Sequence, residues 1–118
     1  MRQHDPWEER MRVICWAVIW FLASLTVVHA EIICVKSHKC LDITPFVCTY
    51  TVSRYVHRVC YDVRTQYMLI LLKNTWYQYC EIDEATVNGL LSAESKGRYY
   101  NGVVKGNFDC QVNRVPSY

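Results

Sequence analysis

The stretch from Phe46 to Asp62, FVCTYTVSRYVHRVCYD, carries two hydrophobic patterns in succession. Residues 49–52 form a short β-like run, and Ser53 after it stands where a helix N-cap belongs. The next apolar positions have the i, i+3, i+4 and i+7 spacing of one helical face: Val56, Val59, Cys60 and Val63. The pattern therefore predicts a single helix here, with Arg54, His57 and Arg58 on its exposed basic side.

Two later runs predict a β-hairpin. Residues 67–72, YMLILL, are continuously apolar, as in a strand buried on both faces. Residues 75–82, TWYQYCEI, alternate between two faces, and Lys73-Asn74 fits a two-residue turn between the runs. Near the start, residues 31–35 are strand-like and Lys36–Lys39 is a polar turn.

The remainder is expected to complete the sheet. Residues 83–97 predict a long loop with a helical turn around 87–93, and Arg98 opens another strand. Asn101-Gly102 is the strongest turn signal, and alternating apolar residues predict a closing strand: Phe108, Cys110 and Val112. The expected fold class is α+β, with one helix packed on an antiparallel β-sheet.

Residues 1–30 are expected to be a signal peptide. Arg10 and Arg12 precede the sixteen-residue apolar run 13–28, which ends at Val28-His29-Ala30. Translation that starts at Met11 would give a more typical signal peptide, because the first ten residues are acidic for its N-terminal region. A membrane anchor is the alternative interpretation of the apolar run. The run is short for a span, so the mature form is expected as one secreted domain, residues 31–118, without a membrane segment.

Cysteine content supports a secreted chain. Of the seven cysteines, Cys15 leaves with the signal and six remain in 88 residues. An even count in a short secreted chain indicates a disulfide framework, which a domain of this size needs because its core is small. The spacing disfavours a metal site, since no Cys-x-x-Cys occurs and only two histidines remain, His38 and His57.

The expected topology suggests a pairing. Cys60 on the helix stripe would meet Cys80 on the hairpin, and Cys48 would join Cys110 to close the domain. That long loop would contribute about 4 kcal/mol in the chain-entropy model. Cys34 and Cys40 would then form a disulfide across the first polar turn.

Charge and chemistry give weaker signals. The mature chain has ten Lys and Arg against eight Asp and Glu, which permits a basic patch without requiring one. His57 beside Arg58 is more typical of a solvated surface than of a catalytic site, and the cluster Glu81, Asp83, Glu84 is more typical of solvated caps. The many tyrosines fit sheet packing better than a stacking site for bases. No cofactor is expected.

The order of motifs resembles the secreted ribonuclease-like effectors of powdery mildew fungi, which are similar in fold to small fungal guanyl-specific ribonucleases. The resemblance is in the aromatic-x-Cys triplet Phe46-Val47-Cys48, a following helix with a cysteine, and a strand pair. It continues in the stretch from Asn101 to Cys110, while residues 75–82 resemble a ribonuclease strand. It implies a microbial-ribonuclease-like fold stabilised by disulfides.

Carried over by position, the resemblance implies that the catalytic groups are missing. Gln78 stands where the catalytic glutamate is expected, and Lys105 stands where a histidine is expected. Arg98 matches an arginine that stabilises phosphate. Proton transfer at a 2′-hydroxyl needs a base and an acid of suitable pKa, which glutamine and lysine do not supply here. The chain is thus expected to be a pseudo-ribonuclease rather than an enzyme.

The function expected on this basis is that of a secreted fungal virulence effector. Its partners would be host plant proteins, host RNA and a plant immune receptor, with translocation into the plant cell, and it would be a monomer. The alternative is an extracellular cysteine-stabilised toxin or antimicrobial protein. The residues expected to bind partners lie on the sheet and on the basic side of the helix: Gln78, Arg98, Lys105, Tyr77, Arg54 and Arg58.

Overall fold

The computed structural model describes residues 26–27, 29–37, 39–111 and 114–118. Six strands precede three short helical elements. The strands are β1 (Ile32–Cys34), β2 (Cys40–Asp42), β3 (Val47–Tyr50), β4 (Val56–Asp62), β5 (Tyr67–Leu72) and β6 (Thr75–Tyr79). The helices are α2 (Glu84–Ser92), α3 (Lys96–Tyr99) and the π-helical turn η1 (Tyr100–Val104). The α+β class, with antiparallel sheets and disulfides, is confirmed.

The strands form two antiparallel sheets. β1 and β2 pair as a separate hairpin, and the other four follow the spatial order β3-β4-β5-β6. The predicted hairpin of β5 and β6 is confirmed, with Leu72 opposite Thr75 and Lys73-Asn74 at the turn. Lys73 has φ +54°, a left-handed conformation that matches the turn to the twist of the strands.

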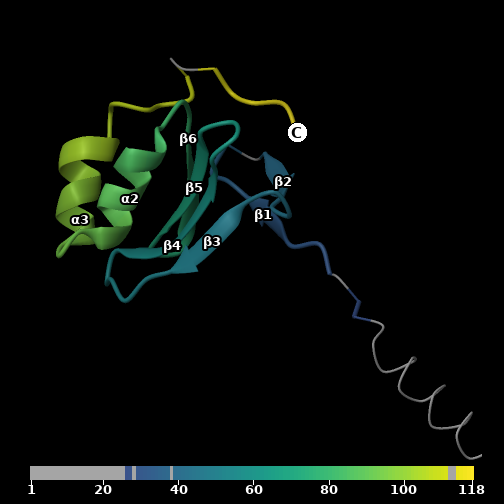
Figure 1. Ribbon diagram of the computed structural model, residues 1–118, viewed down its shortest axis with the longest axis horizontal. Coiled ribbons are helices and arrows are strands. Elements are labelled where there is room, and N and C mark those ends of the chain that lie inside the picture. The colour runs from purple at the N-terminus through teal and green to yellow at the C-terminus, as the bar shows by residue number, and fades with distance from the viewer. Residues whose placement is uncertain (1–25, 28, 38, 112–113) are drawn as a thin grey trace, which may run out of the picture.

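The four-stranded sheet is covered on both faces. Helices α2 and α3 lie on one side of it, and the β1–β2 hairpin lies on the other (Figure 1). On the helix side, residues such as Val59, Met68 and Ile70 pack against Val87 and Leu90 of α2. The hairpin side has its own cluster, which includes Ile33, Leu41, Phe46, Tyr67 and Leu69. Two small cores therefore share one sheet.

The predicted helix within residues 46–62 is wrong, because this stretch forms β3 and β4. The ladder between β4 and β5 shifts register between Val56 and Arg58. This bulge places both Val56 and Val59 on the helix side, although they are three residues apart. One bulge in a strand thus reproduced an i, i+3 spacing. Ser53 does not cap a helix, since its hydroxyl accepts from the N–H groups of Tyr55 and Val56 in the turn before β4.

Helix α2 lies where the sequence predicted a loop with a helical turn around residues 87–93, so the helical turn is confirmed and the helix begins earlier than predicted. α2 begins after Asp83, whose carboxylate accepts from the Thr86 N–H at 3.3 Å and from its hydroxyl at 2.5 Å. These bonds hold the pKa of Asp83 below its usual value. The sequence signal is an aspartate before a run of helix-forming residues, and the prediction that these acids are solvated caps agrees with the N-cap position of Asp83.

The C-terminal expectations also need correction. Arg98 lies in α3 rather than opening a strand, and Asn101-Gly102 lies in η1 rather than in a hairpin turn. The predicted closing strand is reduced to a single bridge between Asp109 and Tyr79, and Val112 lies outside the described residues.

Three disulfides link the six cysteines, and one of the predicted pairs is confirmed, Cys34–Cys40. The other two pairs are Cys48–Cys60 and Cys80–Cys110, so the predicted Cys60–Cys80 and Cys48–Cys110 are wrong. The two predicted pairs are wrong because the helix expected to carry Cys60 is a strand in the structure. Cys60 lies on β4 directly opposite Cys48, and the Cys80 N–H donates to the Phe108 carbonyl at 2.8 Å, which brings Cys110 near.

The predicted signal segment lies almost wholly outside the described residues, so it stays a prediction. Among the residues that are described, no helix has both the length and the apolar character needed to cross a membrane.

Candidate functional site

Arg58 lies on strand β4 and is largely buried, not on an exposed helix face as predicted. Its residue exposure is 9%, and its guanidinium bonds both carboxylate oxygens of Glu31, at 2.5 and 3.1 Å. Its guanidinium carbon also lies 4.6 Å from the centroid of the Tyr50 ring. The hydrogen bond and the charge of Arg58 hold the pKa of Glu31 below its usual value. The expected basic helix face is therefore corrected: Arg58 binds the start of the β1–β2 hairpin to the sheet.

Gln78 and Tyr77 lie on opposite faces of β6, at a cleft of about 460 Å³ that Lys36, Ser37 and Asp109 also line. The Gln78 amide accepts from the Tyr67 hydroxyl and donates to Ser37. Burial raises the pKa of Tyr67, which keeps its hydroxyl protonated as the donor. The glutamine is therefore held by hydrogen bonds within the fold.

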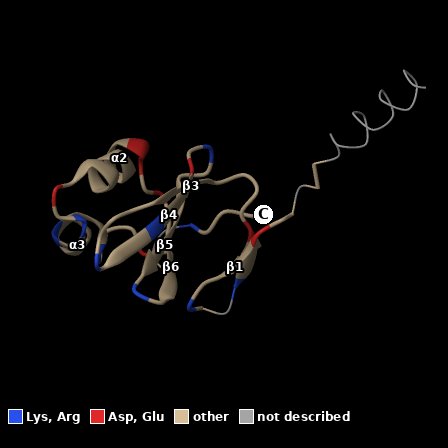
Figure 2. Ribbon diagram, turned by 90° about the horizontal axis from the view of Figure 1, so that it is seen from below, with Lys and Arg blue, Asp and Glu red and all other residues tan. Residues whose placement is uncertain are grey.

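Arg98 and Lys105 do not join Gln78 on a sheet face, as the sequence led us to expect. Arg98 lies in α3, and Lys105 follows η1. Figure 2 shows Lys and Arg distributed over α3, β4 and several loops rather than gathered on one surface. The structure thus places Arg98 and Lys105 in the C-terminal helical segment rather than on the sheet with Gln78.

The two edges of the four-stranded sheet differ. Along β6, the Lys36 N–H donates to the Trp76 carbonyl at 2.9 Å, and Asp109 forms a bridge with Tyr79. Along β3, no strand in the described part of the chain pairs with the outer edge. β3 is therefore the open edge of this sheet.

The register identifies which backbone groups of β3 face outward. The Thr51 N–H donates to the His57 carbonyl at 3.0 Å, so Thr51 and His57 form a hydrogen-bonded pair. Hydrogen-bonded and non-hydrogen-bonded pairs alternate in an antiparallel ladder. The pairs Tyr50–Arg58 and Cys48–Cys60 are then non-hydrogen-bonded, which agrees with the short Cα–Cα distance of 4.0 Å between the two cysteines. The N–H and C=O groups of Cys48 and Tyr50 consequently point away from β4, toward the open edge.

A groove runs along β3 between this edge and helix α2. One part has a volume of about 370 Å³ and is lined by Val47 of β3, Val59 and Tyr61 of β4, and Val87 and Asn88 of α2. The other part, about 570 Å³, extends along the β3–β4 connection to the start of α3. Both parts are lined by Thr49 and Leu91, so they adjoin at these residues. We call them together the β3–α2 groove.

Apolar side chains remain uncovered at this groove. Val47 and Tyr50 are each 75% exposed, and Val52 is fully exposed. β3 carries no charged residue, so charged side chains do not block the open edge in the usual way. An uncharged open strand beside a groove is suited to receiving another extended chain.

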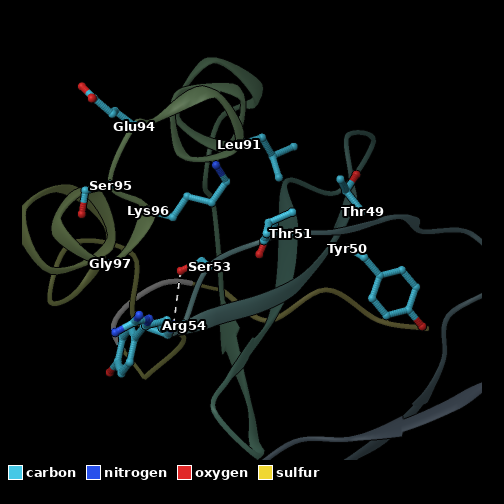
Figure 3. Close-up of a pocket in the computed structure, with 12 residues that line it drawn as sticks. Thr49, Tyr50, Thr51, Ser53, Arg54, Leu91, Glu94, Ser95, Lys96 and Gly97 are labelled. Carbon is cyan, nitrogen blue, oxygen red and sulfur yellow. Dashed lines mark hydrogen bonds between the residues drawn. The ribbon is translucent and has the colours of Figure 1, made fainter.

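The second part of the groove is basic. Arg54 and Lys96 line it together with one carboxylate, Glu94. In Figure 3, Lys96 extends toward Leu91, whereas the Glu94 side chain points away from the cavity. Of the predicted partner-binding residues, Arg54 is the one that lines this groove.

Sequence reasoning missed most of the groove because it interpreted residues 53–63 as a helix. The available signal was the run Val47–Val52, which is rich in β-branched and aromatic residues and has no charge. Whether such a strand is central or at an edge depends on pairing, which the run itself does not reveal.

Comparisons with known proteins point to a different family from the one expected. Residues 52–108 match the family model of the KTSC domain. A crystal structure of a KTSC domain protein from Yersinia pestis is similar to this chain, with a TM-score of 0.52 and 29% sequence identity. The similarity covers 54% of this chain and 92% of the bacterial one. No curated protein matches the sequence.

These findings overturn two expectations. The similarity is to the KTSC domain, not to powdery mildew ribonuclease-like effectors, and nothing supports a fungal virulence function. The short motifs that suggested that resemblance lie partly in wrongly predicted elements, since Asn101 to Cys110 forms η1 and a loop rather than strands. The KTSC match begins at Val52, so the β1–β2 hairpin and β3 lie outside the matched segment.

Proposed function

We propose that this chain is a secreted, disulfide-stabilised binding domain built on a KTSC-type unit, and that it binds an extended peptide segment of a protein partner along β3. The observation that carries the proposal is the open, uncharged edge of β3 beside the β3–α2 groove. The peptide would extend the sheet by one strand, a common form of peptide recognition.

Backbone groups would supply the regular part of this recognition. The outward N–H and C=O groups of Cys48 and Tyr50 offer two donors and two acceptors to an incoming strand. Alternate side chains of the peptide would then point toward α2, where Val47 and Leu91 provide apolar contact. Main-chain bonds would give affinity with little sequence preference, and the groove would select the side chains.

The proposal includes a non-catalytic role. It is supported by the surroundings of the polar groups described above, since Gln78, Asp83 and Arg58 are each occupied in hydrogen bonds that stabilise the fold. Secretion is supported by the three disulfides, because such bonds persist in oxidising compartments and are rare in the cytosol.

Proline at an outward position tests strand addition. In Tyr50→Pro, the lost N–H points away from β4, so the internal ladder keeps its hydrogen bonds while the edge loses a donor. The matched control Tyr50→Val also removes the aromatic ring but keeps the N–H. We expect a displayed library of random linear peptides to yield binders to the wild type and to Tyr50→Val, but not to Tyr50→Pro.

Two results would contradict the proposal. Equal peptide binding by Tyr50→Pro, with its fold verified by circular dichroism, would show that the β3 edge is not used. Concentration-dependent dimerisation in sedimentation that Tyr50→Pro abolishes would show that a second copy of this chain occupies the edge instead.

A further inference from the structure

Resting on the proposed function, we infer that the bound peptide carries an acidic side chain, Asp or Glu, at the end of the groove formed by Arg54 and Lys96. The inference concerns which peptide sequences the domain selects. It does not concern whether the bound peptide extends the sheet as an added strand.

The position of the two cations supports it. Arg54 lies in the β3–β4 connection, a few residues beyond the outward groups of Tyr50, and Lys96 begins α3 on the opposite wall. A peptide strand that continues past Tyr50 would therefore enter the part of the groove that these two positive side chains line. Lys96 is half-buried there, so water screens its charge less than that of a fully exposed lysine.

Both cations have unused bonding capacity. Within the described part of the chain, neither Arg54 nor Lys96 forms an ion pair, whereas Arg58 and Arg64 each have a carboxylate partner. The Lys96 ammonium donates one bond, to the Ala93 carbonyl at 3.1 Å. An ammonium has three donors, so two remain for a ligand.

The neighbouring acid does not cancel this charge. Glu94 is exposed, and its side chain points away from the cavity in Figure 3. The remaining polar lining of this part of the groove is neutral hydroxyl groups, including those of Thr51, Ser53 and Ser95. A carboxylate from the peptide is thus the group that complements this end, and its bonds to the cations would be charge-assisted.

The test uses the disulfide-bonded full chain and a displayed library of random linear peptides. We expect peptides selected on the wild type to share Asp or Glu at one position beside their strand-forming residues. The double variant R54E/K96E is expected to select Lys or Arg at that position and to bind the wild-type peptides roughly ten-fold or more weakly. Lys105→Glu is the matched control, because Lys105 is exposed and does not line the groove; it should keep the acidic preference.

The outcomes separate this inference from the proposed function. Selected peptides without a charge preference, unchanged in R54E/K96E, would overturn the inference and leave strand addition intact. Failure of the wild type to select any peptide beyond those that bind Tyr50→Pro would overturn the proposed function itself. Single-stranded RNA that binds through Arg54 and Lys96 and displaces the peptides would also overturn the inference, since phosphate would then be the ligand.

Discussion

Cys48 and Cys60 lie directly opposite each other on β3 and β4, and their disulfide connects the open edge strand to the fully buried centre of the sheet. Apart from its backbone ladder with β4, β3 has few packing contacts, because most of its side chains are exposed. The bond therefore holds in place the strand that we propose receives the peptide.

Removing this disulfide is expected to loosen β3 selectively. For C48A/C60A, the chain-entropy model gives a loss of about 3 kcal/mol in the free energy of unfolding, to be measured by urea denaturation. Peptide binding should weaken as well, because β3 would have to be ordered during binding. The control C34A/C40A removes the disulfide of the β1–β2 hairpin, which forms a separate sheet and does not include the open edge. Equal loss of peptide binding in both variants would contradict a specific role for Cys48–Cys60.

Gly89 and Tyr99 are expected to show strong coupling. A Cβ on Gly89 would lie 2.3 Å from the Tyr99 hydroxyl oxygen, which donates a 3.0 Å hydrogen bond to the Thr86 carbonyl. Gly89→Ala should therefore lower the melting temperature, although alanine favours a helix over glycine by about 1 kcal/mol. In a Tyr99→Ala background the same substitution should be neutral or stabilising. A double-mutant cycle measures the coupling, and additive effects would contradict this packing.

Stability is expected to fall in acid partly through Asp62. Burial raises the pKa of this carboxyl, but the bonds from the Arg64 side chain and backbone and from the Tyr118 hydroxyl outweigh burial, so the net pKa is lowered. A lowered folded-state pKa gives stability that is present above the unfolded value, about 3.9, and is lost as pH falls through the folded value. Melting temperatures of the wild type should therefore drop more steeply below about pH 4 than those of Asp62→Asn. Parallel curves of melting temperature against pH for the two proteins would show that Asp62 does not contribute to the loss of stability in acid.

Tyr118 connects the C-terminal segment to the sheet. Its ionisation is expected to lower the stability of the fold at alkaline pH. Its ring stacks on Phe46 at 5.3 Å, and burial, together with the hydrogen bond to Asp62, raises its pKa to about 12. A raised folded-state pKa gives stability that is lost as pH rises through that value. Tyr118→Phe should remove one late step from the spectrophotometric titration of the tyrosines. Loss of a step near the ordinary tyrosine pKa of about 10 instead would mean that the ring is not docked.

The sequence predicted those elements whose signals are local. The β5–β6 hairpin follows from an apolar run, an alternating run and a two-residue turn, and Cys34–Cys40 follows from a short loop. The bulge at Val56 gave a strand the spacing of a helix, and this one error changed the expected disulfides. The β3–α2 groove depends on pairing between distant segments and on which edge stays open, and neither has a local signal. Of the expected site, Arg54 alone lines the groove, and the other expected residues have other places in the fold.

The most direct test of strand addition is hydrogen exchange at the individual amides of β3, measured by NMR with and without a selected peptide. In the free protein, the amides of Thr49 and Thr51 should exchange slowly, since they donate to β4, and those of Cys48 and Tyr50 should exchange fast. Saturating peptide should slow exchange at Cys48 and Tyr50 specifically. If these two amides are already protected in the free chain, or remain fast when the peptide is bound, then β3 is not the binding edge.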